Sequence, residues 1–461
     1  MDVPLGPSEL AIPVPRAPLH PTRMQPSRVT PLGALLFSAL FTLFLGGPGP
    51  ALAQTAARTG ARVAATTTRA TAGIEGESTA RGMPRLRATP HSRLDRVVQA
   101  AESAGFAGTI LVADADRVLY ARAVGLADRA AGRAHTLDHG WRWASVTKQV
   151  TALLVMQEVE AGRLRLDQPL AEALPGFAGP TARQVTLRQL LQHTSGLPNP
   201  EDTPKGADGV PAFYRPVASA PVAQAAAATN PSATATGSAG QSANASAALG
   251  YCAGSSARPP GAHFAYNNCD YLVLGAVLEG VTGLPYAALV ERQLARPLGL
   301  ATVRVRAPGT PAGSPAGQPV VGYLAAGAPE PEFDVGTYGA AGALYGTARD
   351  LLAFDRALMA GRLLTPAARA ALWAGDPKLG YAALGAWAFP AALAGCAAPV
   401  SLVERRGAIG GVQVRNVLAP ERGVSVIVFA NTEATDFGEV WRGQGFTYEL
   451  LRAALCPGVD R

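Results

Sequence analysis

Lysine is scarce in this sequence, as are charged residues of any kind. The 40 basic residues of the 461-residue chain include only three lysines, Lys148, Lys205 and Lys378. The arginines are scattered without a basic block or interleaved aromatic residues, so the net charge of +7 does not indicate a nucleic-acid interface. A buried lysine can give up its proton, whereas arginine effectively never does. The scarcity of lysine therefore makes Lys148 a candidate catalytic group.

Cysteine is also rare, with Cys252, Cys269, Cys396 and Cys456 as its only occurrences. No histidine accompanies these cysteines at the spacing of zinc ligands, and the sequence predicts neither a metal site nor a cofactor. Four cysteines allow three disulfide pairings, among which the sequence does not choose. We favour the nearest neighbours, Cys252 with Cys269 and Cys396 with Cys456, formed in an oxidising compartment.

The apolar run Leu32–Leu45 is too short to span a bilayer. It follows an arginine and precedes an Ala-Leu-Ala sequence that ends at Ala53, a pattern typical of a cleaved signal peptide. We therefore predict a signal segment over residues 1–53, with Met24 as an alternative start, and export to the periplasm or the extracellular space. An uncleaved membrane anchor is the alternative interpretation.

Two stretches lack the periodicity of packed structure. Residues 54–90 are rich in Ala, Thr, Arg and Gly and predict a disordered linker, and residues 217–249 are of low complexity and predict a flexible surface insertion. In the rest of the chain, strand patterns stand at both ends and helix patterns fill the middle. This order predicts an α/β (α+β) domain over residues 91–457, with an antiparallel sheet built from both ends, flanking helices and an inserted helical lobe.

Lys148 stands in an unusual place, within "WRWASVTKQVTALLVMQEVEAG" at residues 141–162. It is the only charged residue between Arg142 and Glu158, in a helix pattern that is apolar nearly all round. A buried ammonium is costly unless it is paired or functional. Ser145 precedes it by one helical turn, so both side chains share a face near the positive end of the helix dipole. A hydroxyl, an adjacent proton acceptor and backbone N–H groups are what a serine nucleophile requires.

Four ordered elements extend this pattern beyond Ser-x-x-Lys, which alone occurs by chance in many chains. They are "WASVTKQVTALLVMQEVEAGRLRLDQPLAEALP", "TLRQLLQHTSGLP", "GAHFAYNNCDYLVLGAVLE" and "TYGAAGALYGTARDLLAFDRAL". Together they resemble class C β-lactamases and the related penicillin-binding-protein-like serine hydrolases and esterases. The resemblance runs from about residue 93 to 455 and implies a β-lactamase/transpeptidase-like fold. It is specific for the superfamily but not for the substrate.

The resemblance also implies roles for individual residues. Ser145 would be the nucleophile, Lys148 its partner, and Tyr266 the general base and then the general acid. Asn268 would bind Lys148 or the substrate amide, and the backbone N–H groups of Ser145 and Ala408 would form the oxyanion hole. Physical chemistry agrees, because a nearby cation lowers the pKa of a tyrosine and makes it a usable base.

The family also has a short element on an inner strand, Lys or His, any residue, then Gly. This sequence departs from that pattern. In "VERRGAIGG" these positions hold Arg405, Arg406 and Gly407. Strand alternation directs Arg405 and Gly407 to one face, where the arginine would bind a substrate carboxylate with two hydrogen bonds but would not shuttle protons. The alternative is a replacement of lysine that keeps only its charge.

His193 and Ser195 in "LLQHTSG" are interpreted as structural residues that brace a loop. As a whole, the sequence predicts an exported serine hydrolase that acts through a Ser145 acyl-enzyme on an ester, a D-amino-acid peptide or a β-lactam. Arginine in place of the family's Lys or His at residue 405 favours an esterase or a peptidase over a β-lactamase. Two alternatives stay open: a peptidoglycan- or β-lactam-binding protein with little or no turnover, and an acyltransferase. The predicted partners are small-molecule or peptide substrates, without nucleic acid or metal.

Overall fold

The computed structural model describes residues 90–215, 248–256, 258–309 and 320–456. The predicted signal segment and nearly all of the predicted linker lie outside the described residues, as does most of the predicted insertion over 217–249. Where the described chain resumes, residues 248–252 form a helix. The last two residues of the predicted insertion are thus helical.

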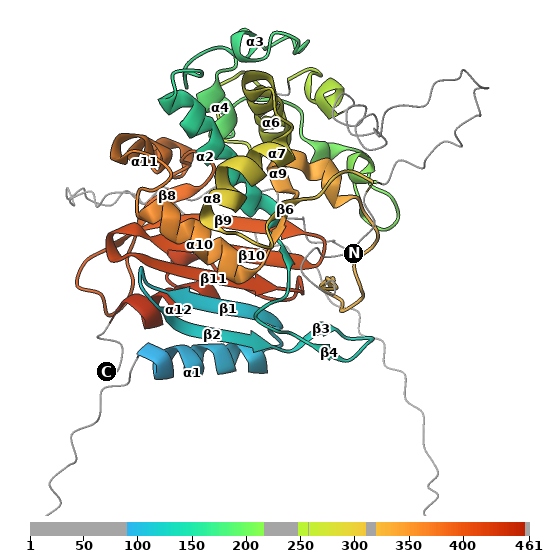
Figure 1. The fold of residues 1–461 in the computed structure, drawn as a ribbon. Helices are drawn as coiled ribbons and strands as arrows, with labels where there is room; N and C mark the ends of the chain where they lie inside the picture. Colours follow the sequence, from blue (N-terminus) through green and yellow to red (C-terminus); the bar gives the residue numbers. More distant parts are fainter. Residues whose placement is uncertain (1–89, 216–247, 257, 310–319, 457–461) are drawn as a thin grey trace, which may run out of the picture. The chain divides into compact units, whose positions relative to one another are not determined.

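Six strands from both ends of the domain form one antiparallel sheet (Figure 1). Every neighbouring pair in it is antiparallel, and β1 pairs in register with β11 from Gly108 opposite Ala430 to Ala113 opposite Ser425. The predicted sheet is therefore confirmed. In spatial order, its strands are β2 (Val118–Val124), β1 (Gly108–Ala113), β11 (Val424–Ala430), β10 (Val412–Ala419), β9 (Val400–Ile409) and β8 (Trp387–Ala391).

Both faces of this sheet are covered, which explains why all seven residues of β11 are buried. On β1, Ile110 and Val112 pack into a core with α1 (Pro90–Ser103) and α12 (Phe446–Leu455), whereas Leu111 packs into the core on the opposite face. In Figure 1, α1 lies below the sheet and α10 (Ala348–Met359) lies across the other face. Alternate residues of β1 thus pack into two separate cores, one on each face of the sheet.

The inserted helical lobe lies between β5 and β8 in the chain. Within this lobe, a π-helical turn at Glu291–Ala295 separates the helices Tyr286–Val290 and Arg296–Leu298. No single helix among the described residues is long and apolar enough to cross a membrane, although Cys269–Thr282 and Tyr286–Leu298 together meet that criterion as a pair bent by 75°. The remaining elements are α2 (Thr147–Glu160), α3 (Leu170–Ala173), α4 (Leu187–Leu191), α6 (Cys269–Thr282), α7 (Tyr286–Val290), α8 (Arg296–Leu298), α9 (Gly339–Gly342), α11 (Pro366–Leu372), and the small sheets β3 (Leu126–Asp128) with β4 (Arg133–Ala134) and β5 (Trp141–Arg142) with β7 (Leu344–Gly346) and β6 (Arg304–Val305).

Both predicted disulfides are confirmed. Cys252 is bonded to Cys269 at the start of α6, with Cα atoms 5.4 Å apart. Cys396, beyond β8, is bonded to Cys456 at the end of α12, with Cα atoms 4.7 Å apart. One bridge therefore lies in the helical lobe, and the other closes the sheet layer.

Candidate active site

Ser145 lies in a short 3-10 turn, Ala144–Val146, rather than in the helix itself. Helix α2 begins two residues later at Thr147, so Lys148 occupies its first turn. Ala144, directly before the candidate nucleophile, has a φ of 46°. An alanine seldom adopts this left-handed conformation, which indicates that the surrounding structure holds the backbone at Ser145 in place.

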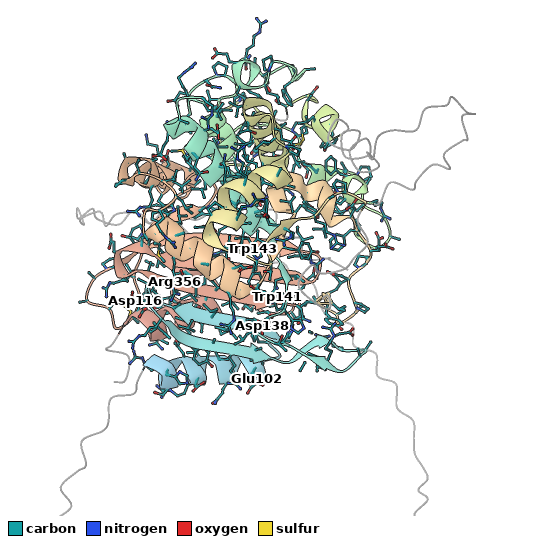
Figure 2. All side chains as sticks on the ribbon, viewed as in Figure 1. Glu102, Asp116, Asp138, Trp141, Trp143 and Arg356 are labelled. Atoms are coloured by element: carbon teal, nitrogen blue, oxygen red, sulfur yellow. A yellow bond between two sulfur atoms is a disulfide. The ribbon has the colours of Figure 1, made fainter. Side chains whose placement is uncertain are left out.

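Two tryptophans fix the approach to this turn (Figure 2). Trp141 stacks on Phe429 of β11, with ring centroids 5.2 Å apart. The Trp143 indole Nε1 donates a hydrogen bond to the carbonyl oxygen of Gly346 at 3.2 Å. Both indoles are almost completely buried. The turn is thereby anchored to the sheet on one side and to β7 on the other.

The Lys148 side chain is fully buried and surrounded by three oxygens. Its Nζ lies 2.7 Å from Asn268 Oδ1, 2.9 Å from the Ala341 carbonyl oxygen and 3.2 Å from Ser145 Oγ. The oxygens of Asn268 and Ala341 can only accept, so each takes one hydrogen of the amine. The remaining site on the nitrogen faces Ser145 Oγ. Burial, aided by the charge of Arg405, holds the pKa of Lys148 well below its usual value. The amine is therefore suited to accept the proton of Ser145.

Tyr266 is the second group that is hydrogen-bonded to the Ser145 hydroxyl, beside Lys148. Its hydroxyl lies 2.6 Å from Ser145 Oγ and accepts a hydrogen bond from Arg405 Nη2, also at 2.6 Å. Burial raises the pKa of Tyr266, while the charge of Arg405 lowers it. A neutral lysine with a phenol and an ammonium with a phenolate contain the same number of protons. The Ser145 hydroxyl contacts both groups and so provides a path for proton shifts between the two states. Burial favours the neutral pair, and Arg405 favours the phenolate.

The side-chain amide of Asn268 has both ends engaged within the protein. Its Oδ1 accepts from Lys148, and its Nδ2 donates to Tyr214 Oη at 2.8 Å and to Glu201 Oε1 at 3.1 Å. An amide nitrogen has two hydrogens, and both are used here. The sequence left two roles open for Asn268, a contact with Lys148 or one with the substrate amide. The structure shows the contact with Lys148.

Strand β9 presents its residues to alternate faces, as the sequence predicted. Arg406 turns away from the site and pairs with Glu404 and Glu439, at 2.7 and 2.8 Å. Arg405 and Gly407 face Ser145. The environment of Arg405 nevertheless differs from the expected one, because the side chain is only 1% exposed.

The guanidinium of Arg405 is engaged by the catalytic candidates themselves. Its Nε donates to the carbonyl oxygen of Ser145 at 2.8 Å, and its Nη2 donates to Tyr266 Oη. Its Cζ lies 5.2 Å from the ring centroids of both Tyr266 and Trp387. The contact with a substrate carboxylate stays a prediction. The observed contacts support a second proposal, in which Arg405 positions Tyr266 and opposes the rise in its pKa that burial causes.

Gly407 permits a close approach between β9 and the nucleophile turn. A Cβ built at this residue would lie 2.9 Å from both Ser145 N and the Trp143 carbonyl oxygen, closer than any real side chain tolerates. The next residue, Ala408, is exposed. An oxyanion hole made by the N–H groups of Ser145 and Ala408 stays a prediction, which this close approach supports.

His193 and Ser195 are buried and bonded to Asp270 of α6. His193 Nδ1 lies 3.0 Å from Asp270 Oδ2, and Ser195 Oγ donates to Asp270 Oδ1. Burial lowers the pKa of His193 and raises that of Asp270, so neither charged form is favoured. These contacts tie the "HTSG" loop to α6, in line with the structural interpretation.

Replacement of Arg405 distinguishes the two roles considered for it. If the guanidinium acts on Tyr266, we expect Arg405→Ala to lower kcat/KM by about tenfold to a hundredfold, equally for a carboxylate-bearing ester and a neutral ester. The rate profile should also move to higher pH, because the charge of Arg405 lowers the pKa of both Tyr266 and Lys148. A loss confined to the carboxylate-bearing ester would instead support a contact between Arg405 and the substrate carboxylate.

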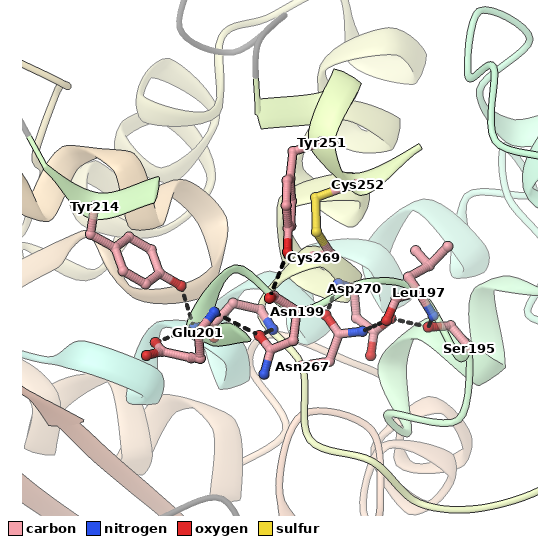
Figure 3. The surroundings of a disulfide bond; sticks show 11 residues. Ser195, Leu197, Asn199, Glu201, Tyr214, Tyr251, Cys252, Asn267, Cys269 and Asp270 are labelled. Carbon is pink, nitrogen blue, oxygen red and sulfur yellow. Dashed lines mark hydrogen bonds between the residues drawn. A yellow bond between two sulfur atoms is a disulfide. The ribbon is translucent and has the colours of Figure 1, made fainter. Parts of the chain in front are cut away.

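The Cys252–Cys269 disulfide lies directly beside these residues, since Cys269 follows Asn268 (Figure 3). Tyr251, next to Cys252, donates through its hydroxyl to the carbonyl oxygen of Asn199 at 2.9 Å. The Asn199 side chain in turn accepts from Asn268 N at 3.2 Å. The bridge thus holds three chain segments together at the candidate site.

The two disulfides provide a matched pair of variants. By loop length, losing the 17-residue Cys252–Cys269 bridge should cost about 3 kcal/mol of stability, and losing the 60-residue Cys396–Cys456 bridge about 4 kcal/mol. We expect the opposite order for activity: the double Ser variant at 252 and 269 should lose far more kcat/KM than the one at 396 and 456. Denaturant unfolding and ester hydrolysis measure both quantities. Equal activities in the two variants would contradict this role of the first bridge.

A serine hydroxyl held by an amine and a phenol, at the head of a helix and beside a sheet strand, is the arrangement of a serine acyl-transfer site. The model of the family described as Beta-lactamase matches residues 94–445. The chain belongs to this family. The proteins to which its sequence is similar include an esterase and a D-alanyl-D-alanine-carboxypeptidase/endopeptidase.

Known proteins resemble the chain over different extents. Esterase EstB of Burkholderia gladioli is 34% identical over 230 residues, which are 45% of this chain and 50% of that protein. Penicillin-binding protein 4 of Amycolatopsis lactamdurans is 33% identical over 198 residues, 42% of this chain and 43% of that protein. The chain thus matches half or less of the length of these relatives. D-amino acid amidase of Ochrobactrum anthropi SV3, solved with L-phenylalanine, superposes with a TM-score of 0.60 at 22% identity over 78% of this chain and 98% of that one, and so shows a shared fold.

Sequence reasoning missed Glu201 and Tyr214, which surround the amide of Asn268. Glu201 follows the "HTSGLP" element within a few residues, and that proximity is the one signal in the sequence that points to it. Tyr214 precedes the low-complexity stretch and carries no motif. Their approach to Asn268 depends on how the intervening loop folds back.

Proposed function

We propose that this protein is an exported serine hydrolase that forms an acyl-enzyme on Ser145. The observation that carries the proposal is that Ser145 Oγ, just before α2, is hydrogen-bonded both to Lys148 and to Tyr266. The two disulfides support export, because such bonds persist in oxidising compartments. Small esters and D-amino-acid amides or peptides are the proposed substrates, with β-lactams as a less favoured class.

In the proposed reaction, the Ser145 proton passes to Lys148 or Tyr266 as Oγ attacks the substrate carbonyl carbon. Backbone N–H groups at Ser145 and Ala408 stabilise the oxyanion. The carbonyl re-forms as the bond to the leaving group breaks, and Tyr266 donates a proton to that group. Water then attacks the acyl-enzyme with the same groups as base, which releases the acid and restores the Ser145 hydroxyl.

Two features support an esterase or an amide-cleaving enzyme over a β-lactamase. Arg405 stands where the resemblance leads one to expect Lys or His, and it is bonded to Tyr266. The amide of Asn268 has no donor left for a substrate. The relatives point the same way, since they include an esterase and a D-alanyl-D-alanine carboxypeptidase/endopeptidase.

Intact-protein mass spectrometry tests this proposal. We expect a fluorophosphonate probe to add one phosphonyl group, which peptide mapping assigns to Ser145. A penicillin in a separate incubation then distinguishes the remaining possibilities. A transient adduct with product release indicates turnover, a lasting adduct indicates a β-lactam-binding protein, and ester consumption only with an added alcohol or amine indicates an acyltransferase. No adduct with the fluorophosphonate would contradict the proposal.

A further inference from the structure

The amine of Lys148 depends on a backbone group for its orientation. A neutral amine has two hydrogens and one lone pair, and the Ala341 carbonyl oxygen and Asn268 Oδ1 take the two hydrogens at 2.9 and 2.7 Å. The lone pair is therefore left for Ser145 Oγ, which lies 3.2 Å away. Without the Ala341 carbonyl, the amine would be free to turn a hydrogen toward the hydroxyl, and it would then no longer accept the Ser145 proton. The position of this carbonyl consequently matters for the proposed reaction.

Two successive carbonyls of α9 are bonded to side chains of α2, against which α9 packs in the helical lobe (Figure 1). The Ala341 carbonyl oxygen accepts from Lys148 Nζ, and the Ala340 carbonyl oxygen accepts from Thr151 Oγ1 at 2.7 Å. Lys148 and Thr151 lie one helical turn apart, so they meet the two carbonyls from the same face of α2. Since adjoining peptide units are planar and share a Cα atom, the contact of Thr151 with one carbonyl also restrains the other.

Tyr286, the first residue of α7, fixes the direction of the Thr151 hydrogen bond. The threonine hydroxyl has one hydrogen, and it points to the nearer of two carbonyl oxygens, that of Ala340 at 2.7 Å rather than that of Thr147 at 3.2 Å. Tyr286 Oη lies 2.7 Å from Thr151 Oγ1, so the phenol is the donor in that contact. Burial raises the pKa of Tyr286, which keeps the phenol protonated. The hydrogen bonds therefore run from Tyr286 through Thr151 to the Ala340 carbonyl.

These hydrogen bonds are shielded from water, because Thr151 is fully buried and Tyr286 is only 6% exposed. A buried hydrogen bond has no water to replace a lost partner, so it holds its groups more firmly than an exposed one. We propose that Thr151 and Tyr286 are positioning residues of the candidate active site, which hold the Ala341 carbonyl where it directs the lone pair of Lys148 to Ser145. This proposal rests on the proposed hydrolase function and adds two residues to it.

Thr151→Val tests the proposal, because valine keeps the branched shape of threonine and lacks its hydroxyl. We expect kcat for a chromogenic ester to fall about tenfold with little change in KM, since the amine loses its orientation while the substrate contacts remain. The acidic limb of the kcat profile should also move to lower pH. The reason is that a carbonyl oxygen stabilises the ammonium form of Lys148, so its displacement lowers the pKa of that amine further. Thr151→Ser keeps the hydroxyl and should restore most of the rate and the original profile.

Thr109→Val provides a matched control. Thr109 on β1 is as fully buried as Thr151, and its hydroxyl has no hydrogen-bond partner among the described residues. The same change of atoms there should leave kcat and the pH profile unchanged. A loss of stability without a shift of the profile is what a merely structural role of Thr151 would produce, and it would overturn the proposal.

Fluorophosphonate labelling separates this proposal from the hydrolase function. A wild-type protein that takes no label contradicts the hydrolase, whereas a Thr151→Val variant with wild-type labelling and kinetics overturns the positioning role alone. The packing of α6 on α9, where a Cβ built at Gly275 would lie 2.7 Å from Ala340 Cβ, would then suffice to place the carbonyl. If Thr151→Val does not fold, Tyr286→Phe decides, because it removes only the hydroxyl that donates to Thr151. A loss of about two- to threefold in kcat with the same shift supports the proposal, and an unshifted profile overturns it.

Discussion

Ser145→Ala is expected to abolish acylation while the protein stays folded. The hydroxyl is the proposed nucleophile, and loss of a nucleophile that acts with its base as a unit costs at least about 10⁴-fold in kcat. The polar neighbours keep partners without it: Lys148 retains Asn268 and Ala341, and Tyr266 retains Arg405. We therefore expect the free energy of unfolding to change by no more than about 1 kcal/mol.

Hydrolysis of a chromogenic ester, fluorophosphonate labelling and denaturant unfolding measure the three parts of this prediction. The alanine variant should fail in the first two assays and match the wild type in the third. A variant that hydrolyses the ester at the wild-type rate would show that the nucleophile lies elsewhere, and a large loss of stability would show that the hydroxyl is a structural group.

The pairing of Ser145 with Lys148 was predictable because it is local. Three residues on a helical turn fix which side chains meet, and the scarcity of lysine marked this one as unusual. The strands of the sheet were predictable for a similar reason, since the apolar alternation on β1 and β11 reflects two buried faces. The disulfides followed from nearest-neighbour pairing, which agrees with the observed bonds.

The partners of Arg405 were not predictable from its strand. Alternation gave its face correctly, but the side chain ends on Tyr266 and on the Ser145 backbone, which lie 139 and 260 residues away in the sequence. Strand geometry alone does not say whether a long side chain at such a position reaches the substrate or a neighbouring residue. Burial decides, and the rings that lie beside the Arg405 guanidinium, Tyr266 and Trp387, are distant from it in the sequence.

Glu201 escaped prediction because a loop positions it. Its turn has no apolar periodicity, and its contact with Asn268 joins residues 67 positions apart. The same loop holds Asn199, which accepts from the Asn268 backbone. The sequence therefore describes the segment of Ser145 and Lys148 better than the loop that surrounds Asn268.

Lys148→Arg is expected to be nearly as damaging as Lys148→Ala, with kcat lowered by at least about 10³-fold. The lysine side chain is fully buried, and both burial and the charge of Arg405 hold its pKa well below the usual value. A guanidinium at this place would remain charged next to Arg405 and would have no lone pair to accept the proton of Ser145. It is also larger and planar, whereas the Nζ position is enclosed by Asn268 and the Ala341 carbonyl oxygen.

Lys148→Met provides the control for this experiment, because it keeps the length of the side chain and removes the amine. We expect the methionine variant to be inactive but well folded, and the arginine variant to be both inactive and less stable, because a permanent charge in this position lacks compensation. Single-turnover ester cleavage and thermal unfolding of the three variants test this order. If Lys148→Arg instead retains most of its activity, positive charge alone is what matters at this position, and the proton of Ser145 must pass to Tyr266, whose oxygen lies 2.6 Å away.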